Sequence, residues 1–245
     1  MGQHKPWPRI SVDREAWLGA AKEIAAGHAT LLSMWADAQT VHLAAIAEQI
    51  GVCIFSLECA GGHFPSVANL HAPAIHLERT ISDLSGLVAA GAPDTRSWLD
   101  HDRWGVRHPL GDGNACDPAL ATYAFLPSEG EGLHQIAVGP VHAGIIEPGH
   151  FRFTVNGETV VRLEERLGYV HKGIDALMRG SAIDRAAKLA GRVSGDSTVA
   201  YSWAFARAVE AALEIEVPPR GQYLRALMAE LERIANHFGD IGAIC

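Results

Sequence analysis

Apolar residues near the start of the chain recur first at helical spacing and then at alternating spacing. Between Ser11, a residue type that caps helices, and Gly27, a residue type that ends them, the periodicity predicts a helix over 12–26. Its apolar face comprises Trp17, Leu18, Ala21 and Ile24. Three strand-like runs follow, at 30–36, 40–47 and 52–58. A second helix is predicted over 74–90, so the first half has the pattern of a small α/β domain.

A β-hairpin is predicted where the second half begins. Asn156-Gly157 supplies the turn between an alternating run that ends at Val155 and a returning run at 159–163. Asn-Gly between two such runs is the strongest short-range hairpin signal. The charged residues that follow, 164–166, are expected to face solvent.

Helices are predicted for the remainder of the chain. An Ala-rich helix over 181–213 is expected to be interrupted at Gly191 or Gly195, and Pro218-Pro219 starts a last helix. The apolar stripe of this last helix comprises Tyr223, Leu227, Leu231, Ile234, Phe238 and Ile241. The apolar pattern continues up to Cys245 with no residue that would end the helix, so we expect the helical domain to be truncated there. The fold class predicted for the whole chain is α+β: a small α/β domain, then a mainly helical domain opened by a β-hairpin.

Residues 91–132 are rich in Gly, Pro, Asp and Ser and show no regular periodicity. A connector of this length is more often functional or interface-forming than idle. We place the domain boundary within it, near residue 130. The predicted domains are therefore 1–130 and 131–245.

Composition narrows the functional classes. Among 245 residues, 20 Lys+Arg stand against 28 Asp+Glu, a formal net charge of −8, so no nucleic-acid partner is expected through bulk charge. No apolar run is long enough to predict a membrane span, and the N-terminus lacks the apolar segment of a secretory signal. The four cysteines form no C-x-x-C, and the glycine-rich phosphate-binding motifs are absent. We expect a cytoplasmic protein with free thiols.

Three short motifs stand in order within residues 65–110. They are ERTISDLSGL at 78–87, APDTR at 92–96 and WGVRHPL at 104–110. Their order and spacing resemble the C subunit of NADH-quinone oxidoreductase (complex I), whose form is roughly E-R-E-x-x-D-L-F-G, then H-P-D-x-R, then a P-L close. Three positions depart from that form: Thr80, Ser85 and Ala92. The resemblance implies a C-subunit type of α/β domain.

A second set of motifs lies in residues 139–245. They are GPVHAGIIEPGHFRF at 139–153, LGYVHKGI at 167–174 and IEVPPR at 215–220. These resemble the start of the complex I D subunit, and still more the large subunit of group 4 nickel–iron hydrogenases such as formate hydrogenlyase. A C-type domain fused ahead of a D-type domain is the arrangement of those hydrogenase subunits. The resemblance implies an oxidoreductase subunit in a membrane-associated complex.

The first metal-binding motif of such hydrogenases reads R-x-C-G-x-C, followed by a His. Here the same frame reads RVSGDSTVAYS at 192–202, with Ser194 and Ser197 for the cysteines and Tyr201 for the His. Nickel–iron chemistry needs soft, deprotonated thiolates, which a hydroxyl does not replace at neutral pH. We therefore expect no nickel–iron centre and no metal ligand in this chain.

In complex I the same frame carries a His and a Tyr that hydrogen-bond the quinone head. Alignment with those motifs places Ile146 and Gly195 at the two positions. Neither residue has a side chain that donates a proton. Quinone reduction by those two groups is therefore not expected, although a quinone could still occupy the pocket.

The polar residues that remain in the frame are the candidate site. The candidates for catalysis and proton handling are Glu147, His150, Arg192 and Asp196, the last of which could hold a fixed charge beside Arg192. The candidates at the metal and quinone positions of the family are His142, Ser194, Ser197 and Tyr201. Two interpretations stay open: a modified redox or proton-handling cavity, or a pocket whose polar groups only hydrogen-bond to one another.

The resemblance implies the following function. The chain would carry electrons from an iron–sulfur subunit toward quinone or a related acceptor, with no cofactor of its own and the cluster in the partner. Its other partners would be membrane-arm subunits, which would hold it peripherally on the inner membrane. The first alternative is a non-catalytic scaffold in such a complex. The second is an active nickel–iron hydrogenase, which is ranked last because the cysteines are lost.

Overall fold

The computed structural model describes residues 4–118, 122–142 and 147–245. The chain divides into two compact units, Met1–Tyr123 and Ala124–Cys245. The division falls within the connector noted in the sequence, and each unit has its own β-sheet. The domain limits of 1–130 and 131–245 remain a prediction.

The first unit is built on a four-stranded sheet. Its strands are β1 (Arg9–Val12), β2 (Thr30–Asp37), β3 (Thr40–Ala47) and β4 (Gly51–Glu58), in the order β1-β4-β3-β2. β1 runs parallel to β4, and the other neighbours are antiparallel. The three predicted strands are therefore confirmed. β1, which the short run RISV forms, was not predicted.

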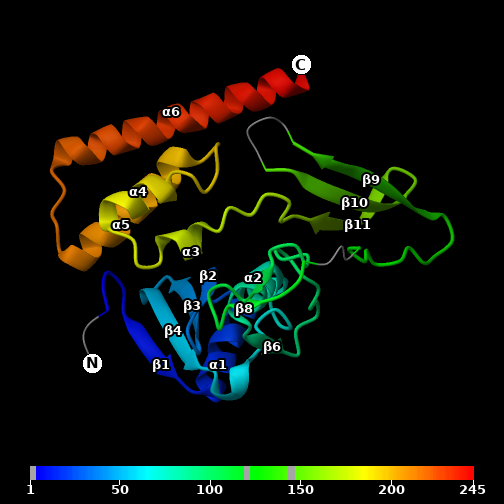
Figure 1. The fold of residues 1–245 in the computed structure, drawn as a ribbon, viewed down its shortest axis with the longest axis horizontal. Coiled ribbons are helices and arrows are strands. Elements are labelled where there is room, and N and C mark those ends of the chain that lie inside the picture. The colour runs from blue at the N-terminus through cyan, green and yellow to red at the C-terminus, as the bar shows by residue number, and fades with distance from the viewer. Residues whose placement is uncertain (1–3, 119–121, 143–146) are drawn as a thin grey trace. The chain divides into compact units, whose positions relative to one another are not determined.

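Two helices, α1 (Arg14–Ala25) and α2 (Ile75–Ser85), pack on one face of this sheet (Figure 1). Val41 and Leu43 of β3 are fully buried there against Trp17 of α1, whose indole Nε1 donates to the carbonyl of Pro65 at 3.0 Å. The alternation in β3 thus indicated the core face correctly. His42 points to the opposite face, and yet it is also buried.

The helix limits differ from the predicted ones for local reasons. Asp13, not Ser11, caps α1, because its carboxylate accepts the N–H of Ala16 at 2.8 Å while Ser11 lies in β1. The predicted helix over 74–90 was too long. Gly86 adopts a left-handed conformation, φ 77°, which ends α2, and Val88 belongs to the next strand.

Short strands complete the first unit. β5 (His63–Pro65) pairs in parallel with β6 (Val88–Ala90), and β7 (Val106–Arg107) pairs antiparallel with β8 (Asn114–Ala115). Two 3-10 turns precede α2, at Ala60–Gly62 and Ala72–Ala74. The segment from 91 to 118 is otherwise irregular, as the sequence predicts.

The second unit opens with a three-stranded antiparallel sheet in the order β11-β10-β9. Its strands are β9 (Leu133–Val141), β10 (Gly149–Asn156) and β11 (Thr159–Arg166). The predicted hairpin at Asn156-Gly157 is confirmed. β9 was not predicted, because Gly139-Pro140 interrupts its apolar alternation. The expectation for 164–166 was wrong at two positions: Glu164 and Arg166 are buried, and Glu164 accepts the N–H of Leu126 at 3.1 Å.

Four helices follow the sheet. They are α3 (Ile174–Met178), α4 (Ile183–Ala190), α5 (Thr198–Leu213) and α6 (Pro219–Ile244). The predicted break near Gly191 and Gly195 is confirmed, as is the start of the last helix at Pro219. Within the described part of the chain, no helix combines the length and apolar content that a membrane crossing requires.

α6 contacts α5 through its polar and small residues. Its less exposed positions recur at helical spacing and are Gly221, Arg225, Ala229, Glu232 and Asn236. Arg225 forms a two-pronged ion pair with Glu210 of α5, at 2.9 and 2.5 Å. The apolar stripe predicted from the sequence lies on the other side and is exposed, with Leu231 at 51% and Phe238 at 70%. Packing of α6 within this chain therefore depends on hydrogen bonds rather than on its apolar side.

Candidate functional site

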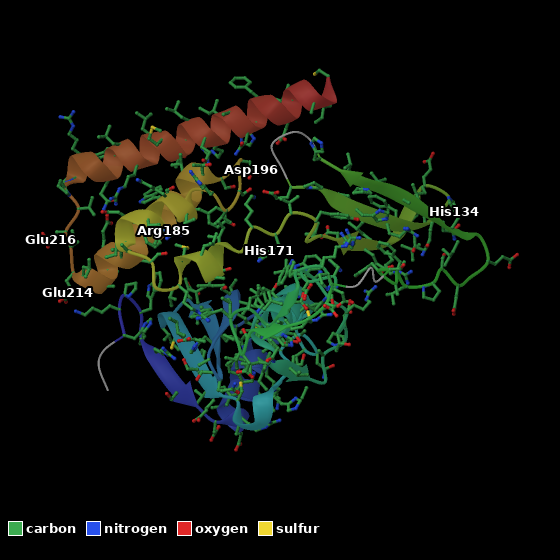
Figure 2. The ribbon with its side chains drawn as sticks, in the orientation of Figure 1. His134, His171, Arg185, Asp196, Glu214 and Glu216 are labelled. Atoms are coloured by element: carbon green, nitrogen blue, oxygen red, sulfur yellow. The ribbon has the colours of Figure 1, made fainter. Side chains whose placement is uncertain are left out.

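Asp196 is the centre of a compact polar cluster in the loop between α4 and α5 (Figure 2). The hydroxyl groups of Ser194 and Ser197 both donate to the same carboxylate oxygen, Oδ1, the second at 3.3 Å. The Ser194 hydrogen bond is the main cause that lowers the pKa of Asp196, because it stabilises the ionised carboxylate. The cluster is therefore a fixed negative charge held by two hydroxyl donors.

Two residues of α6 hold this loop from the side. The side-chain amide of Asn236 donates to the backbone carbonyl of Asp196 at 2.6 Å. The carboxylate of Glu232 accepts the N–H of Val199 at 2.5 Å and that of Ala200 at 3.1 Å. These are first-turn N–H groups of α5, which a residue at the position of Ser197 commonly caps. Here the Ser197 hydroxyl binds Asp196 instead, and Glu232 takes over the cap.

Lys172 joins the segment before β10 to the segment before Asp196. Its ammonium donates to the carboxylate of Glu147 and, at 3.1 Å, to the carbonyl of Val193, which directly precedes Ser194. The structure thus brings Glu147 to the same segment as Ser194, Asp196 and Ser197. Lys172 was not among the predicted site residues, although it lies within the LGYVHKGI motif.

His150 and Arg192 do not share the Asp196 cluster. His150 is buried in β10, where its ring bonds the carbonyl of Gly139 at 3.1 Å and accepts from Arg152 at 3.3 Å. The ring also lies 4.9 Å from that of Phe125. Arg192 is exposed, and among the described residues no ion pair joins it to Asp196.

The remaining predicted residues lie at the margins. Tyr201 is in the first turn of α5 with its side chain 44% exposed, and its backbone N–H donates to the carbonyl of Ser197 at 3.0 Å. His142 is exposed and directly follows β9. Ile146, which the quinone alignment singled out, lies outside the described residues.

A second constellation occupies the first unit, at the motif that begins with Glu78. This buried carboxylate accepts from Ser66 Oγ at 2.8 Å and from the N–H groups of Val67 and Ala68 at 2.6 and 3.0 Å. Burial raises the pKa of Glu78, against these three hydrogen bonds, which lower it. The carboxylate therefore holds the turn after β5 against α2.

Arg79, the next residue, holds the connector. Its guanidinium donates to the carbonyls of Arg96 and Ser97 at 2.6 and 2.8 Å, and it lies 4.9 Å from the ring of Trp98. Together with Ala92, Asp94 and neighbouring side chains it lines a cavity of about 200 Å³. The sequence pattern did not mark Arg79 as more than part of a motif, because its partners lie at least 15 residues away.

The donors around Asp196 do not fit a nickel–iron centre. Ser194 and Ser197 use their hydroxyl protons to bind Asp196. A protonated hydroxyl is a poor ligand for a soft metal, which prefers a thiolate. The four cysteines are Cys53, Cys59, Cys116 and Cys245, of which the first three lie in the other unit. Among the described residues, no three His, Cys, Asp or Glu side chains group as ligands of a metal ion.

Comparison with known families matches both halves of the chain. Residues 10–114 match the family described as "Respiratory-chain NADH dehydrogenase, 30 Kd subunit", and residues 172–239 match "Nickel-dependent hydrogenase". The second match contains Lys172, the Asp196 cluster, Glu232 and Asn236. The first contains Glu78, Arg79 and the partners named above; a further partner of Arg79, the hydroxyl of Tyr123 at 3.2 Å, lies beyond it.

Curated proteins are similar to large parts of this chain. Hydrogenase-4 component G of Escherichia coli is 37% identical over 192 residues, and formate hydrogenlyase subunit 5 of the same organism is 33% identical; each alignment covers 74% of this chain and 34% of the relative. The C/D subunit of NADH-quinone oxidoreductase from Bdellovibrio bacteriovorus is 28% identical over 177 residues, 67% of this chain and 31% of the relative. The chain thus spans about a third of the length of these relatives. The chain therefore combines a domain that matches the 30 kDa (C) subunit of complex I with a region similar to the large subunit of nickel–iron hydrogenases.

Proposed function

We propose that this chain is an oxidoreductase subunit that handles electrons and protons without a nickel–iron centre of its own. Electrons would come from an iron–sulfur cluster in a partner subunit and pass toward quinone or a related acceptor. The observation that carries the proposal is the Asp196 cluster, in which hydroxyls stand at the cysteine positions of the family motif and bind a carboxylate. With both serine protons on Asp196, the cluster offers no thiolate to a metal, and the Lys172 ammonium is the nearby hydrogen-bond donor for an organic acceptor.

The residues around Asp196 have defined roles in this proposal. The Lys172 ammonium, held by Glu147 and the Val193 carbonyl, would donate a hydrogen bond to a carbonyl oxygen of the acceptor. Asp196 stays ionised because its pKa is lowered, so it would hold the serine hydroxyls in place rather than supply protons. A reduced quinone takes up protons, and Glu147, exposed beside Lys172, is the group that can relay them.

Assembly and location are part of the same proposal. The relatives are named as a component of hydrogenase-4 and as subunits of formate hydrogenlyase and of NADH-quinone oxidoreductase, and a further one as the alpha subunit of a membrane-bound hydrogenase of Pyrococcus furiosus. We infer an iron–sulfur subunit and membrane-arm subunits as partners. Contact with them would place the chain in the cytoplasm, peripherally on the inner membrane.

The test is quinone reduction by the native complex, isolated from membranes with a tag on this chain. Co-purification of an iron–sulfur subunit and loss of at least tenfold in turnover in Lys172→Met and Asp196→Asn would support the proposal. Glu230→Gln is the matched control, since Glu230 lies on α6 in an exposed pair with Arg233. Isolation of the chain without an iron–sulfur partner, or stoichiometric nickel in it, would contradict the proposal.

A non-catalytic scaffold is the second candidate, and one observation favours it. Ser194, Ser197 and the Asp196 carbonyl all have partners within the chain, as expected of a network that only stabilises the loop. In that case the complex would assemble with full turnover in Asp196→Asn and Lys172→Met. The same experiment therefore separates the two candidates.

A further inference from the structure

Asn236 and Glu232 lie on α6, 40 and 33 residues beyond their partners Asp196 and Val199. They are one helical turn apart, so both side chains project from the face that packs on α5. Asn236 fixes the carbonyl of Asp196, and Glu232 fixes the first N–H groups of α5 at Val199 and Ala200. The loop is thus fastened at Asp196 itself and just after Ser197.

The hydrogen bonds from Asn236 and Glu232 fix the backbone from which the two serine hydroxyls reach Asp196. Ser194 and Ser197 approach a single carboxylate oxygen from opposite ends of a four-residue segment. Such convergence requires a fixed backbone, because each hydroxyl rotates freely and either could turn to solvent. Glu232 also relieves Ser197 of its ordinary capping role, which leaves the Ser197 hydroxyl available to Asp196.

We propose that Asn236 and Glu232 are positioning residues for the Asp196 site: they hold the loop from α6 so that both serine hydroxyls converge on the carboxylate. The inference rests on the proposed function for the importance of the site, but its geometry is independent of any acceptor. Both residues bind backbone groups of the loop and of the start of α5, so their role is to position the site and they are not catalytic residues. Their effect passes through the backbone of residues 194–200.

The experiment measures the titration of Asp196 in the full chain by NMR of its carboxyl carbon. Asn236→Leu changes no charge and removes the donor to Asp196, so the hydroxyl hydrogen bonds should loosen and the pKa of Asp196 should rise toward its ordinary value of 3.8. Asn236→Gln keeps an amide donor and should restore part of the shift. Circular dichroism checks that the helix content is retained.

Arg225→Gln is the matched control. It breaks the ion pair with Glu210, which fastens α6 to α5 at a distance from the loop, and should leave the titration of Asp196 unchanged. An unchanged Asp196 pKa in Asn236→Leu would overturn the inference. An equal rise in Arg225→Gln would also overturn it, since that result would indicate general loosening of α6. A rise confined to Asn236→Leu, with normal turnover in Asp196→Asn, would support the positioning role and contradict the proposed function.

Discussion

The carboxylate of Asp83 accepts the backbone N–H of Leu99 at 2.7 Å, across 16 residues of sequence. The same oxygen, Oδ2, accepts the N–H groups of Trp98 at 2.8 Å and Asp100 at 3.2 Å. With Arg79 bound to the carbonyls of Arg96 and Ser97, one face of α2 binds both donors and acceptors of the backbone at residues 96–100. The motif at 78–87 therefore orders the irregular stretch 96–100 through contacts from α2.

Loss of the Asp83 carboxylate should make the backbone of residues 98–100 more mobile. In Asp83→Asn the three N–H groups of residues 98–100 lose a charged acceptor, and their protection from hydrogen exchange should fall by at least tenfold. Hydrogen exchange with mass spectrometry of peptides covering 97–101 measures this. Asp112→Asn, at an exposed position, is the control and should exchange like the parent. Equal protection in both variants would show that Asp83 does not hold the connector.

Replacement of Glu78 by Leu should destabilise the first unit. It leaves Ser66 Oγ and the N–H groups of Val67 and Ala68 buried without an acceptor, at about 1–3 kcal/mol for each unsatisfied group. A total loss of about 3 kcal/mol or more is expected in urea unfolding followed by Trp fluorescence. Glu78→Gln, which retains one acceptor oxygen, should lose less, and the exposed Glu48→Gln should stay within about 0.5 kcal/mol of the parent.

His42 should make the stability of the fold depend on pH. Burial, and then the nearby Arg9, lower its pKa from 6.5 to about 4, while its ring binds Ser56 Oγ at 2.9 Å. Between these two values the unfolded chain binds a proton that the folded chain does not. Stability therefore falls as the pH decreases from 6.5 to about 4, by about 3 kcal/mol at 1.4 kcal/mol per pH unit.

Thermal or urea unfolding at several pH values measures this slope. His42→Gln should flatten it, although the variant itself can be less stable at neutral pH. His28→Gln should keep it, because His28 lies in an exposed pair with Glu23. The same slope in the parent and in His42→Gln would assign the dependence to another group.

A methyl group at Gly139 should disrupt the pairing of β9 with β10. Gly139 has φ +95°, and a Cβ built there would lie 2.4 Å from the carbonyl oxygen of Gly149 and 2.7 Å from the amide nitrogen of Val141. Since both neighbours are backbone atoms, Gly139→Ala should cost more than about 2 kcal/mol. Gly157→Ala is the control: φ is +57° with open space, so its cost should stay near 1–2 kcal/mol. Urea unfolding of the two variants compares them directly.

Local patterns in the sequence determined the hairpin at Asn156-Gly157, the three strands 30–58, the break between α4 and α5 and the start of α6 at Pro219. Each of these depends on side-chain periodicity or on turn residues within a few positions. The family motifs likewise located the polar frame around Asp196 from the sequence alone. Neighbouring residues carry enough information for such features, because turns and helix ends are decided by local backbone preferences.

Only the tertiary structure decided which groups meet. Asn236 binds Asp196 across 40 residues, and Lys172 binds Val193 across 21. His150, which lies in the same sequence motif as Glu147, binds within its own sheet instead. It also showed that α6 packs through Glu232 and Asn236 and leaves its apolar stripe exposed. Periodicity shows that a helix has two faces, but which face of α6 contacts α5 depends on the groups that α5 and the preceding loop present, and these are distant in the sequence.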